Sequence, residues 1–318
     1  TLDRIQNVAN IIKKIKDEGH DVIAVVSAMS GETNKLIEYA EYYSKTPKAD
    51  EIDMLLSSGE RVTSALLSIA LNEMGYKATS MSGRQAGIMT DNAHTKARIE
   101  SIDTTEMKKA IKDGNIIIVA GFQGVAQDTL RVSTLGRGGS DLTAVAIAGA
   151  IEADVCEIYT DVDGIYTTDP RIEPKAKKLD KISYDEMLEL ASLGAKVLQN
   201  RSVEMAKKLN VNLVSRSSFT PEVEGTLITK EENIMEKPIV SGIALDKNQI
   251  RVGMYGVTDK PGIAASIFTS LADENINVDM IVQTVGVDGK TDLDFTIPTT
   301  DLLICKNVME KFKKDTEN

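Results

Sequence analysis

The sequence predicts an α/β fold, in which a mainly parallel sheet is sandwiched by helices, followed by a smaller ferredoxin-like α+β domain. The chain has 318 residues, more than the ~250–300 at which a single hydrophobic core stops growing, so two domains are expected. Apolar strand patterns alternate with helical ones through the first part of the chain, which indicates a parallel sheet covered by helices. The pattern changes in the charged, irregular stretch at residues 222–237, which is typical of a linker. We place the domains at residues 1–235 and 236–318.

The elements of the larger domain are predicted from hydrophobic periodicity and from residues that begin or end helices. Ile5, Val8, Ile12 and Ile15 recur at helical spacing and Gly19 follows them, so the chain opens with a helix. The same criteria predict, in chain order, a strand at 21–26, a helix at 32–43, one unbroken helix at 50–74, strands at 76–80 and 116–120, a helix at 142–151, a strand at 155–160, a helix opened by a capping box at 183–186, a helix at 203–209 and a strand at 211–214.

The smaller domain is predicted as a compact βαββα unit, the order of a ferredoxin-like plait without its last strand. Residues 292–297 alternate polar and apolar side chains, as a strand with one exposed face does. The pattern predicts a strand at 250–255, a turn at 259–262, a helix with Ala264, Ile267, Phe268 and Leu271 on one face, strands at 277–285 and 292–297, and a helix at 302–314.

Composition and charge narrow the classes of function. Acidic residues outnumber basic ones by 48 to 37, and the net charge of −11 argues against a nucleic-acid partner but not against a phosphorylated small molecule. The longest apolar runs are too short to span a bilayer, so no membrane partner is expected. Cys156 and Cys305 are far apart in apolar surroundings, which is typical of reduced thiols in a cytoplasmic protein. His20 and His94 are too few for a His-ligated zinc site or a Ser-His-Asp triad.

The most informative motif is Thr134-Leu135-Gly136-Arg137-Gly138-Gly139-Ser140-Asp141, directly ahead of the predicted 142–151 helix. Glycines let the backbone approach a ligand closely, and a helix N-terminus favours an anion. The guanidinium of Arg137 is suited to bidentate pairing with a carboxylate or phosphate. The run matches neither a Walker loop nor a dinucleotide fingerprint. The alternative is that Ser140 and Asp141 serve only as helix caps.

A second loop, residues 159–171, follows a predicted buried strand, and ligands of open α/β sheets bind beyond such strand ends. Tyr166 is suited to stacking on a nucleotide and Arg171 to pairing with phosphate. Its aspartates do not have EF-hand spacing, and the alternative is a turn-rich structural loop. Glu60 and Lys196 are weak signals singly, since a first-turn glutamate and a lysine lying along apolar surface are both common.

Several further segments join these two motifs: Ser-Ala-Met-Ser-Gly-Glu-Thr-Asn at 27–34, Ser-Gly-Glu-Arg at 58–61, Gly-Phe-Gln-Gly at 121–124 and Gly-Ala-Lys-Val-Leu at 194–198. In this combination and order the sequence resembles the aspartate kinases (aspartokinases) of the amino acid kinase family over essentially the whole chain. The segments at 257–262 and 276–283 resemble an ACT domain.

The resemblance implies that ATP, with Mg²⁺, phosphorylates the side-chain carboxylate of L-aspartate to 4-phospho-L-aspartate, the first step towards lysine, threonine and methionine. That carboxylate is ionised at neutral pH and needs no general base, so positioning and charge neutralisation carry catalysis. Glu60 would face the substrate ammonium and Arg137 a substrate carboxylate. The implied residues are, for aspartate, Thr33, Glu60, Arg137, Gly138, Gly139 and Ser140; for catalysis, Arg137, Ser140 and Asp141; and for ATP, Thr160, Asp161, Tyr166, Asp169, Arg171 and Lys196.

The ACT resemblance implies feedback inhibition by lysine, threonine or both, in a homo-oligomer (dimer or tetramer) joined through ACT domains. Lysine is the first choice, because the stand-alone kinase type resembles lysine-pathway enzymes. Asp259 and Asn277 can alternatively act only as turn residues. The implied effector site consists of Asp259, Gly262, Ile263, Ala264, Asn277, Val278, Asp279 and Gln283.

The sequence departs from the family pattern at both ends. Family members begin with a Lys-x-Gly-Gly-Thr/Ser segment that binds phosphates, and they continue into a closing ACT strand and a second ACT unit. We therefore expect the sequence to be part of a longer chain. Two alternatives stay open: another amino acid kinase, such as a glutamate or acetylglutamate kinase, and a non-catalytic amino-acid sensor on the same fold.

Overall fold

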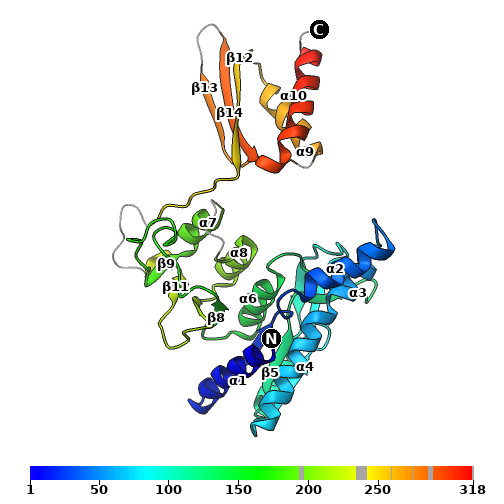
Figure 1. Cartoon of the computed structure of the whole chain (residues 1–318), viewed down its shortest axis with the longest axis vertical. Coiled ribbons are helices and arrows are strands. Elements are labelled where there is room, and N and C mark those ends of the chain that lie inside the picture. Colours follow the sequence, from blue (N-terminus) through cyan, green and yellow to red (C-terminus); the bar gives the residue numbers. More distant parts are fainter. Residues whose placement is uncertain (193–196, 234–241, 259, 275, 286–288, 317–318) are drawn as a thin grey trace. The chain divides into compact units, whose positions relative to one another are not determined.

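The computed structural model describes the chain except at residues 193–196, 234–241, 259, 275, 286–288 and 317–318. The chain divides into two compact units, Thr1–Ala244 and Leu245–Asn318, each with its own core (Figure 1). Both predicted fold classes are confirmed: the first unit is a layered α/β structure in which parallel strand pairs predominate, and the second is α+β. In the described part of the chain, no helix has the length and apolar character needed to cross a membrane.

The elements of the first unit are, in chain order, α1 (Leu2–Asp17), β1 (Ile23–Val26), α2 (Glu32–Tyr43), α3 (Ala49–Leu56), α4 (Ser58–Glu73), β2 (Ala78–Met81), β3 (Ile88–Thr90), β4 (Ile99–Ile102), α5 (Thr105–Lys112), β5 (Ile116–Ala120), β6 (Gln123–Ala126), β7 (Val132–Thr134), α6 (Gly139–Ile151), β8 (Cys156–Thr160), β9 (Lys181–Ser183), α7 (Tyr184–Ser192), α8 (Asn200–Leu209), β10 (Leu213–Ser217), β11 (Thr226–Thr229) and the short 3-10 helix Glu231–Asn233.

A fully buried strand forms the centre of this unit. β5 pairs in parallel with β1 on one side and with β2 on the other. Its side chains alternate: Ile116 and Ile118 pack with α1 and α4, whereas Ile117 and Val119 pack with residues of α5 and α6. Because helices cover both faces, every residue of β5 is apolar and buried, as expected for a parallel sheet between helical layers.

A small four-stranded sheet, in the order β4-β3-β6-β7, follows from the end of β5. β6 and β7 form an antiparallel hairpin in which Gln123 lies opposite Thr134. The chain enters β6 through Phe122, a non-glycine residue with φ +68°. The Gly-Arg-Gly-Gly segment follows this hairpin and leads into the start of α6.

A third sheet, in the order β8-β10-β11-β9, packs against α6, α7 and α8. Ile158, Leu213 and Ile228 of its strands contact a core that includes Val203 of α8 and Met187 of α7. The capping box predicted at the start of α7 is confirmed: the Ser183 hydroxyl accepts from Glu186 N–H (3.2 Å), and Glu186 Oε2 accepts from Ser183 N–H (2.9 Å).

Several predictions about elements are wrong in detail, among them the strand expected at 277–285, which begins only at Ile281. The helix expected at 50–74 is divided at Ser57 into α3 and α4, and at this point the Gln123 amide donates to the Ser57 carbonyl (2.9 Å). The helix expected from residue 142 begins at Gly139, so Ser140 and Asp141 lie in its first turn. The stretch at 222–237 is not all linker, since β11 lies within it and pairs with β9 and β10.

The second unit has the predicted βαββα order. Its elements are β12 (Gln249–Thr258), α9 (Ile263–Asp273), β13 (Ile281–Val285), β14 (Lys290–Pro298), the 3-10 helix Thr299–Asp301 and α10 (Leu302–Thr316). The strands form an antiparallel sheet in the order β12-β14-β13, with both helices on one face (Figure 1). Phe295 of β14 packs with Ile267 and Leu271 of α9 and with Val308 of α10, because alternate residues of β14 point to this face.

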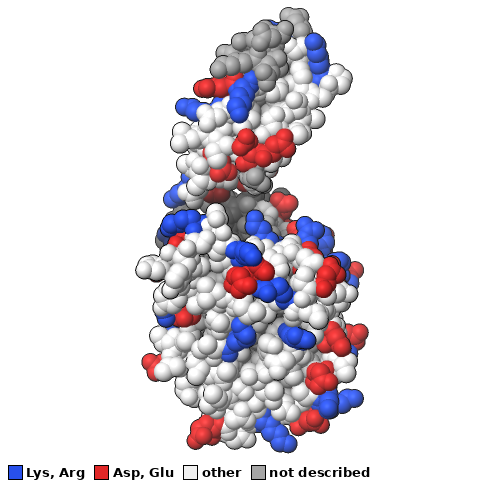
Figure 2. All heavy atoms as spheres, turned by 90° about the vertical axis from the view of Figure 1, so that its right-hand side faces the viewer, with Lys and Arg blue, Asp and Glu red and all other residues white. Residues whose placement is uncertain are grey.

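The face drawn in Figure 2 has no large patch of charges of one sign. There, Lys and Arg side chains are interspersed with Asp and Glu, and uncharged residues cover much of the rest. On this face, therefore, charges of neither sign gather at one place.

Ser183→Ala tests the contribution of the capping box to the fold. Removal of the hydroxyl leaves Glu186 N–H without its cap, so the free energy of unfolding should fall by about 1 kcal/mol. Denaturant unfolding of both proteins gives this difference. Ser101→Ala, at an exposed position of β4, is the control and should change stability by less than about 0.5 kcal/mol. Equal stability of the two variants would contradict the assigned role of the cap.

Candidate active site

The candidate site lies beyond the C-terminal ends of β1 and β5. These parallel neighbours end side by side at Val26 and Ala120, and Gly121 N–H donates to the Val26 carbonyl (3.0 Å). Residues 27–31 then lead into α2, and residues 121–122 lead into the β6–β7 hairpin that precedes α6. Parallel α/β sheets bind ligands at this edge, where loops and helix N-termini meet.

Glu60, in the first turn of α4, is the buried acid of the site, with 4% of its surface exposed. Ala28 N–H donates to its Oε1 (3.1 Å), whereas its Oε2 is buried with no hydrogen-bond partner among the described residues. Gly59 allows this approach, since a Cβ there would lie 2.8 Å from the Cβ of Ala28. Burial raises the pKa of Glu60 and outweighs the opposing effect of the Ala28 hydrogen bond. The open oxygen is suited to a cationic donor from a ligand.

Thr33 lies on the same side of the site as Glu60. It is the second residue of α2, whose N-cap Gly31 has φ +83°. The Cγ of Glu32 would lie 3.9 Å from a Cβ at Gly59, so the N-termini of α2 and α4 adjoin. Two helix N-termini and one buried carboxylate thus surround this side.

The glycine-rich segment forms a tight turn into α6. Gly136 and Gly138 have φ +78° and +70°, a region that glycine enters without strain, and Gly138 is the N-cap of α6. A Cβ at Gly121 would lie 2.8 Å from Ser140 Oγ, so the start of α6 lies directly against the end of β5. A Cβ at Gly139 would similarly lie 2.8 Å from the Phe122 ring. The motif therefore permits a close helix–strand contact at the site.

Arg137 is exposed, and its side chain makes no hydrogen bond or ion pair with any described residue. The backbone beside it is held firmly, because Arg201 of α8 donates to the carbonyls of Leu135 (2.5 Å) and Ala97 (3.1 Å). Gly138 is covered by Gln199, whose Cγ would lie 2.0 Å from a Cβ there. The site thus has a free guanidinium on a fixed loop, which is the arrangement needed to bind an anionic group.

Asp141, next to Ser140 in the first turn of α6, is half-buried, and its burial raises its pKa. No described residue forms a hydrogen bond with its carboxylate. Cys156 is a free, buried thiol, as predicted, and burial together with the charges of Asp141 and Glu157 raises its pKa to about 12. The thiol therefore stays protonated at neutral pH and is not a nucleophile.

The residues predicted to bind ATP begin at the end of β8. Only residues 152–155 separate α6 from β8, and the two elements pack together, so β8 ends near the start of α6. Thr160 Oγ1 accepts from Val162 N–H (3.1 Å), and Asp161 is exposed. The predicted aspartate-binding and ATP-binding residues at these positions therefore flank the N-terminus of α6.

Further along the same loop, the side chains predicted to contact ATP form hydrogen bonds with other residues of the loop. The Tyr166 hydroxyl donates to Asp163 Oδ1 (3.0 Å), and burial raises the pKa of Tyr166. Arg171 donates from Nε to Asp169 Oδ1 (3.0 Å), with 89% of its side chain exposed. Lys196, the remaining predicted contact, lies outside the described residues.

Metal-binding clusters are absent from the part of the chain that the structure describes: no three or more His, Cys, Asp or Glu side chains are grouped to hold an ion. Mg²⁺ that arrives with a nucleotide is held largely by phosphates and needs only one or two carboxylates. The Asp141 carboxylate, which has no described hydrogen-bond partner, suits that role.

Apart from Gln283, which lies within β13, the described effector-binding residues predicted for the second unit fall at two opposite ends of its sheet. Gly262, with φ +97°, is the N-cap of α9 just after β12 ends. Asn277 and Asp279 come just before β13, which starts opposite Phe295, and Phe295 in turn pairs with Val252 near the start of β12. β12 and β13 run in the same direction, so the end of one and the start of the other are far apart. Asp259 lies outside the described residues.

The side chains at these two ends already have partners within the unit. Asp279 accepts from Gln249 Nε2 (2.6 Å) and Asn277 Nδ2 (3.4 Å), and Gln283 Nε2 donates to Thr291 Oγ1 (3.3 Å). Ile263 and Ala264 form the first turn of α9, and Val278 packs against the core. An effector would therefore meet an ordered surface rather than unpaired groups.

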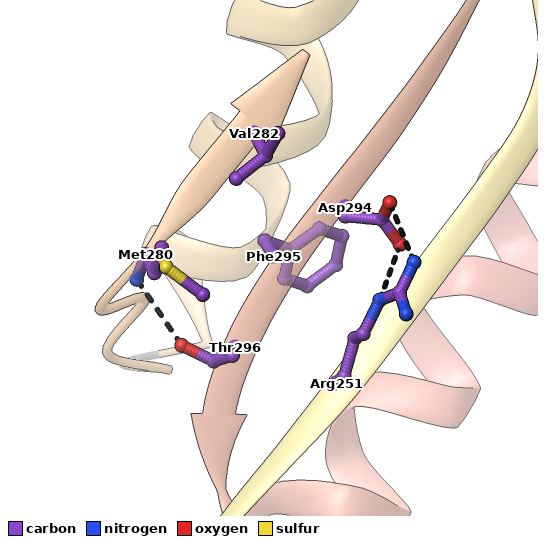
Figure 3. Close-up of a pocket in the computed structure, with 6 residues that line it drawn as sticks. All are labelled: Arg251, Met280, Val282, Asp294, Phe295 and Thr296. Carbon is purple, nitrogen blue, oxygen red and sulfur yellow. Dashed lines mark hydrogen bonds and ion pairs between the residues drawn. The ribbon is translucent and has the colours of Figure 1, made fainter. Parts of the chain in front are cut away.

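A hollow of about 300 Å³ is present on the sheet of the second unit (Figure 3). The ion pair between Arg251 and Asp294 crosses it, with two N–O distances of 2.9 Å. Because these charges satisfy each other, the hollow offers an apolar floor without an open charged group. The described residues that line it are Arg251, Met280, Val282, Asp294, Phe295 and Thr296, none of which is a predicted effector contact.

Sequence reasoning missed four polar residues that hold the loops of the site: Asp53, Gln123, Gln199 and Arg201. Asp53 interrupts the apolar stretch Ile52–Leu56 of α3, and a lone acid there is a recognisable signal for a buried partner. Gln123 lies inside one of the recognised motifs, but its role depends on a contact 66 residues away.

Comparison with known proteins was made for the whole chain. Residues 1–214 match the sequence pattern of the amino acid kinase family, and residues 245–311 match that of an ACT domain. An aspartokinase of Helicobacter pylori (strain J99) is 57% identical over 316 residues, which are 98% of this chain and 78% of the relative. An aspartokinase of Pseudomonas aeruginosa is 51% identical over 320 residues, covering 100% of this chain and 76% of the relative.

Solved structures give the same grouping. E. coli aspartokinase III in complex with aspartate and ADP (R-state) is 26% identical, with a TM-score of 0.75 over 94% of this chain and 75% of that one. The same enzyme in complex with lysine and aspartate (T-state) is 25% identical, with a TM-score of 0.79 over 98% of this chain and 80% of that one.

Glu60→Gln tests the buried carboxylate. Burial places the folded-state pKa of Glu60 above the unfolded value of about 4.3, so its contribution to stability falls as the pH rises through this interval. The ligand-free variant should therefore be more stable than the unaltered protein at pH 7, and the gain should shrink towards pH 4. Urea unfolding at both pH values measures it. Glu100→Gln, on exposed β4, is the control for the loss of a surface carboxylate. A Glu60 variant less stable than the unaltered protein at pH 7 would refute the assignment.

Proposed function

This chain belongs to the amino acid kinase family, as an aspartokinase with an ACT domain, and from that premise we propose that it transfers the ATP γ-phosphoryl group to the side-chain carboxylate of L-aspartate. The product is 4-phospho-L-aspartate. The observation that carries the proposal is the pair of unmatched charges at one sheet edge: Glu60, with a buried open oxygen, and Arg137, with a free guanidinium. An amino-dicarboxylic acid complements both.

The chemistry needs no activated side-chain nucleophile. The substrate carboxylate is already ionised at neutral pH, so it attacks the γ-phosphorus directly, and the γ-phosphoryl–oxygen bond to ADP breaks in line. In this chain, Glu60 would bind the ammonium, and Arg137 with the backbone of Gly138 and Gly139 would hold a carboxylate of the substrate. Thr33 would contact the same ligand from the N-terminus of α2. These contacts fix the attacking oxygen before reaction, and such positioning supplies much of the rate.

Ser140 and Asp141 would lie nearest to the transferred group, because they form the first turn of the helix that separates the two predicted subsites. The N–H groups of this turn favour anionic phosphate oxygens. Mg²⁺ would neutralise phosphate charge when bound with ATP, and Asp141 is the carboxylate suited to face it. Its raised pKa suits proximity to a cation, which restores the ionised form.

The nucleotide would bind along the loop after β8. Thr160 and Asp161 at the strand end, Tyr166, Asp169 and Arg171 further along, and Lys196 complete the proposed contacts. Arg171 is paired with Asp169 in the ligand-free protein, so contact with phosphate requires that ion pair to open or be shared. At this exposure solvent screens the ion pair, so it contributes little and phosphate competes for it readily.

Regulation is proposed to act through the ACT domain, with lysine as the first candidate effector and threonine as the second. The E. coli enzyme crystallised with lysine in its T-state supports lysine. The predicted effector contacts near Gly262 and those near Asn277 lie at opposite ends of one sheet. A single copy therefore does not bring both sets of contacts to one free amino acid. We therefore propose a homo-oligomer, at least a dimer, in which two ACT units form each effector site.

The defining experiment follows ADP release by the complete natural protein with L-aspartate as acceptor. Hydroxylamine converts the acyl phosphate product into a hydroxamate, which identifies carboxylate phosphorylation. Release of ADP that depends on aspartate, with hydroxamate in equal amount, supports the proposal. Activity with L-glutamate or N-acetylglutamate instead would favour another amino acid kinase, and no activity with any acceptor would favour an amino-acid sensor.

Arg137→Lys tests the carboxylate contact. A lysine keeps the charge but loses the bidentate fork, so kcat/KM for aspartate should fall ~10-fold or more, while the KM for ATP changes less. Steady-state kinetics with each substrate varied in turn gives both values. Arg84→Lys, at an exposed position with no described ion pair, is the control and should behave like the unaltered enzyme. Unchanged aspartate kinetics in the Arg137 variant would remove Arg137 from the site.

Asp279→Ala tests the effector site. Loss of the carboxylate removes the proposed partner of the effector ammonium, so the inhibitory concentration of lysine or threonine should rise ~10-fold or more, with the uninhibited kcat nearly unchanged. Inhibition curves at fixed aspartate measure the shift. Asp273→Ala changes an exposed aspartate at the end of α9, and this control variant should be inhibited at the same effector concentration as the unaltered enzyme. If calorimetry detects no binding of either amino acid to the unaltered protein at millimolar concentration, the regulatory proposal fails.

A further inference from the structure

We propose that Thr134 and Gln123, together with Asp53, are positioning residues that hold the two charged ends of the substrate site at a fixed separation. The inference rests on the proposed function, since it assumes that Glu60 and Arg137 bind the two ends of one ligand. Neither Thr134 nor Gln123 has a place in the reaction chemistry. Their side chains instead make buried hydrogen bonds to Asp53 and Ser57, at the corner between α3 and α4, and these bonds form a buried frame.

The first link of this frame joins β6 to the corner between α3 and α4. Gln123 is 2% exposed, and its Nε2 donates to the carbonyl of Ser57 (2.9 Å). Ser57, fully buried, is the residue at which the two helices separate, and Glu60 follows three positions later in the first turn of α4. The start of α4, and with it Glu60, is therefore tied to the hairpin.

The second link joins β7 to the same corner. The hydroxyl of Thr134 donates to Oδ1 of Asp53, a carboxylate with no exposed surface. Asp53 also accepts from Thr95 N–H (3.1 Å) and contacts His94 Nδ1 (2.7 Å). Three residues after Thr134 comes Arg137, so this link sets the base of the loop that carries the guanidinium.

The Gln123–Ser57 and Thr134–Asp53 hydrogen bonds connect the same two elements because of the spacing of these residues. Asp53 lies in α3 and Ser57, its C-cap, is four residues further on, so both lie on one side of the helix end, where Ser57 N–H donates to the Asp53 carbonyl (3.0 Å). Gln123 and Thr134 are directly opposed in the β6–β7 hairpin, so their side chains emerge on the same face. Two buried hydrogen bonds thus join one helix face to one hairpin face, and rotation between the two is prevented.

The consequence for binding is geometric. Glu60 projects from the helix side of the frame and Arg137 from the hairpin side, and neither contacts the other. Without the links, each charged group can move with its own element, and the entropy of restoring their separation opposes ligand binding. The effect should therefore appear in aspartate binding rather than in ATP binding, which uses the loop after β8.

The test compares isosteric variants in the complete natural protein. Thr134→Val deletes the hydroxyl, Thr134→Ser retains it, and Gln123→Met deletes the amide donor. Ser133→Ala is the matched control: Ser133 is the fully buried neighbour in β7, and its hydroxyl pairs with Thr90 (2.6 Å) on the other face of the hairpin. Each variant is measured for thermal stability, for aspartate affinity by calorimetry, and for the KM of aspartate and of ATP.

The inference predicts that Thr134→Val and Gln123→Met raise the aspartate Kd and KM ~10-fold or more, with the ATP KM within ~2–3-fold of the unaltered enzyme. Thr134→Ser should keep its aspartate Kd and KM within ~2-fold of the unaltered enzyme. Ser133→Ala should lose stability as Thr134→Val does but keep its aspartate KM. Either of two results overturns the inference: unchanged aspartate affinity in Thr134→Val and Gln123→Met, or an equal rise in Ser133→Ala. An unaltered enzyme that releases no ADP with aspartate would instead refute the proposed function.

Discussion

The burial of β5 between two layers of helices is the constraint on which the first unit depends. A strand whose residues are all apolar and covered on both faces can expose functional groups only at its ends. Because β5 is parallel to β1, both strands release their chains at the same edge, and that edge is where α2, α4 and α6 begin. Because Gly121 has no side chain, α6 can approach closely; a Cβ there would lie 2.8 Å from Ser140 Oγ. The location of the site thus follows from how the core is covered.

The electrostatics of the site divide between a buried charge and an exposed one. Glu60 is desolvated when the protein folds, and only one of its oxygens receives a hydrogen bond. Arg137 stays in solvent on a loop whose neighbouring carbonyl is held by Arg201. Under the proposed function, a substrate ammonium would meet the buried, open oxygen of Glu60, whereas a substrate carboxylate would have to desolvate Arg137 itself. In that case the buried end would favour selectivity for the ammonium, and the exposed end would favour fast capture of the anion.

The sequence predicted those parts of the structure that depend on local pattern. The α2 helix at Glu32–Tyr43, the β5 strand at Ile116–Ala120 and the βαββα order of the second unit all matched, because their periodicity extends over whole elements. The strands β3, β4, β6 and β7 have three or four residues each, too few for alternation to be recognised. The division of the helix at Ser57 could not be predicted from local pattern either, and the Gln123 amide that contacts it is 66 residues away. Motifs supplied the residue types of the site, whereas Asp53 and Thr134, 81 positions apart, meet only through the fold. The roles assigned to the site residues stay predictions.

The proposed regulation has a geometric consequence in the second unit. β13 is five residues long, and apart from Gln283 within it the predicted effector contacts form two groups beyond its two ends, roughly 16 Å apart at about 3.3 Å per residue. A free amino acid is much shorter than this distance, so a complete effector site needs the Gly262 end of one copy beside the Asn277 end of another. A two-fold axis that brings these ends together once brings them together twice, which yields two equal sites in one interface. Effector binding would then be linked to the arrangement of the copies, and by thermodynamic reciprocity any aspartate-dependent change in that arrangement must alter effector affinity by the same factor.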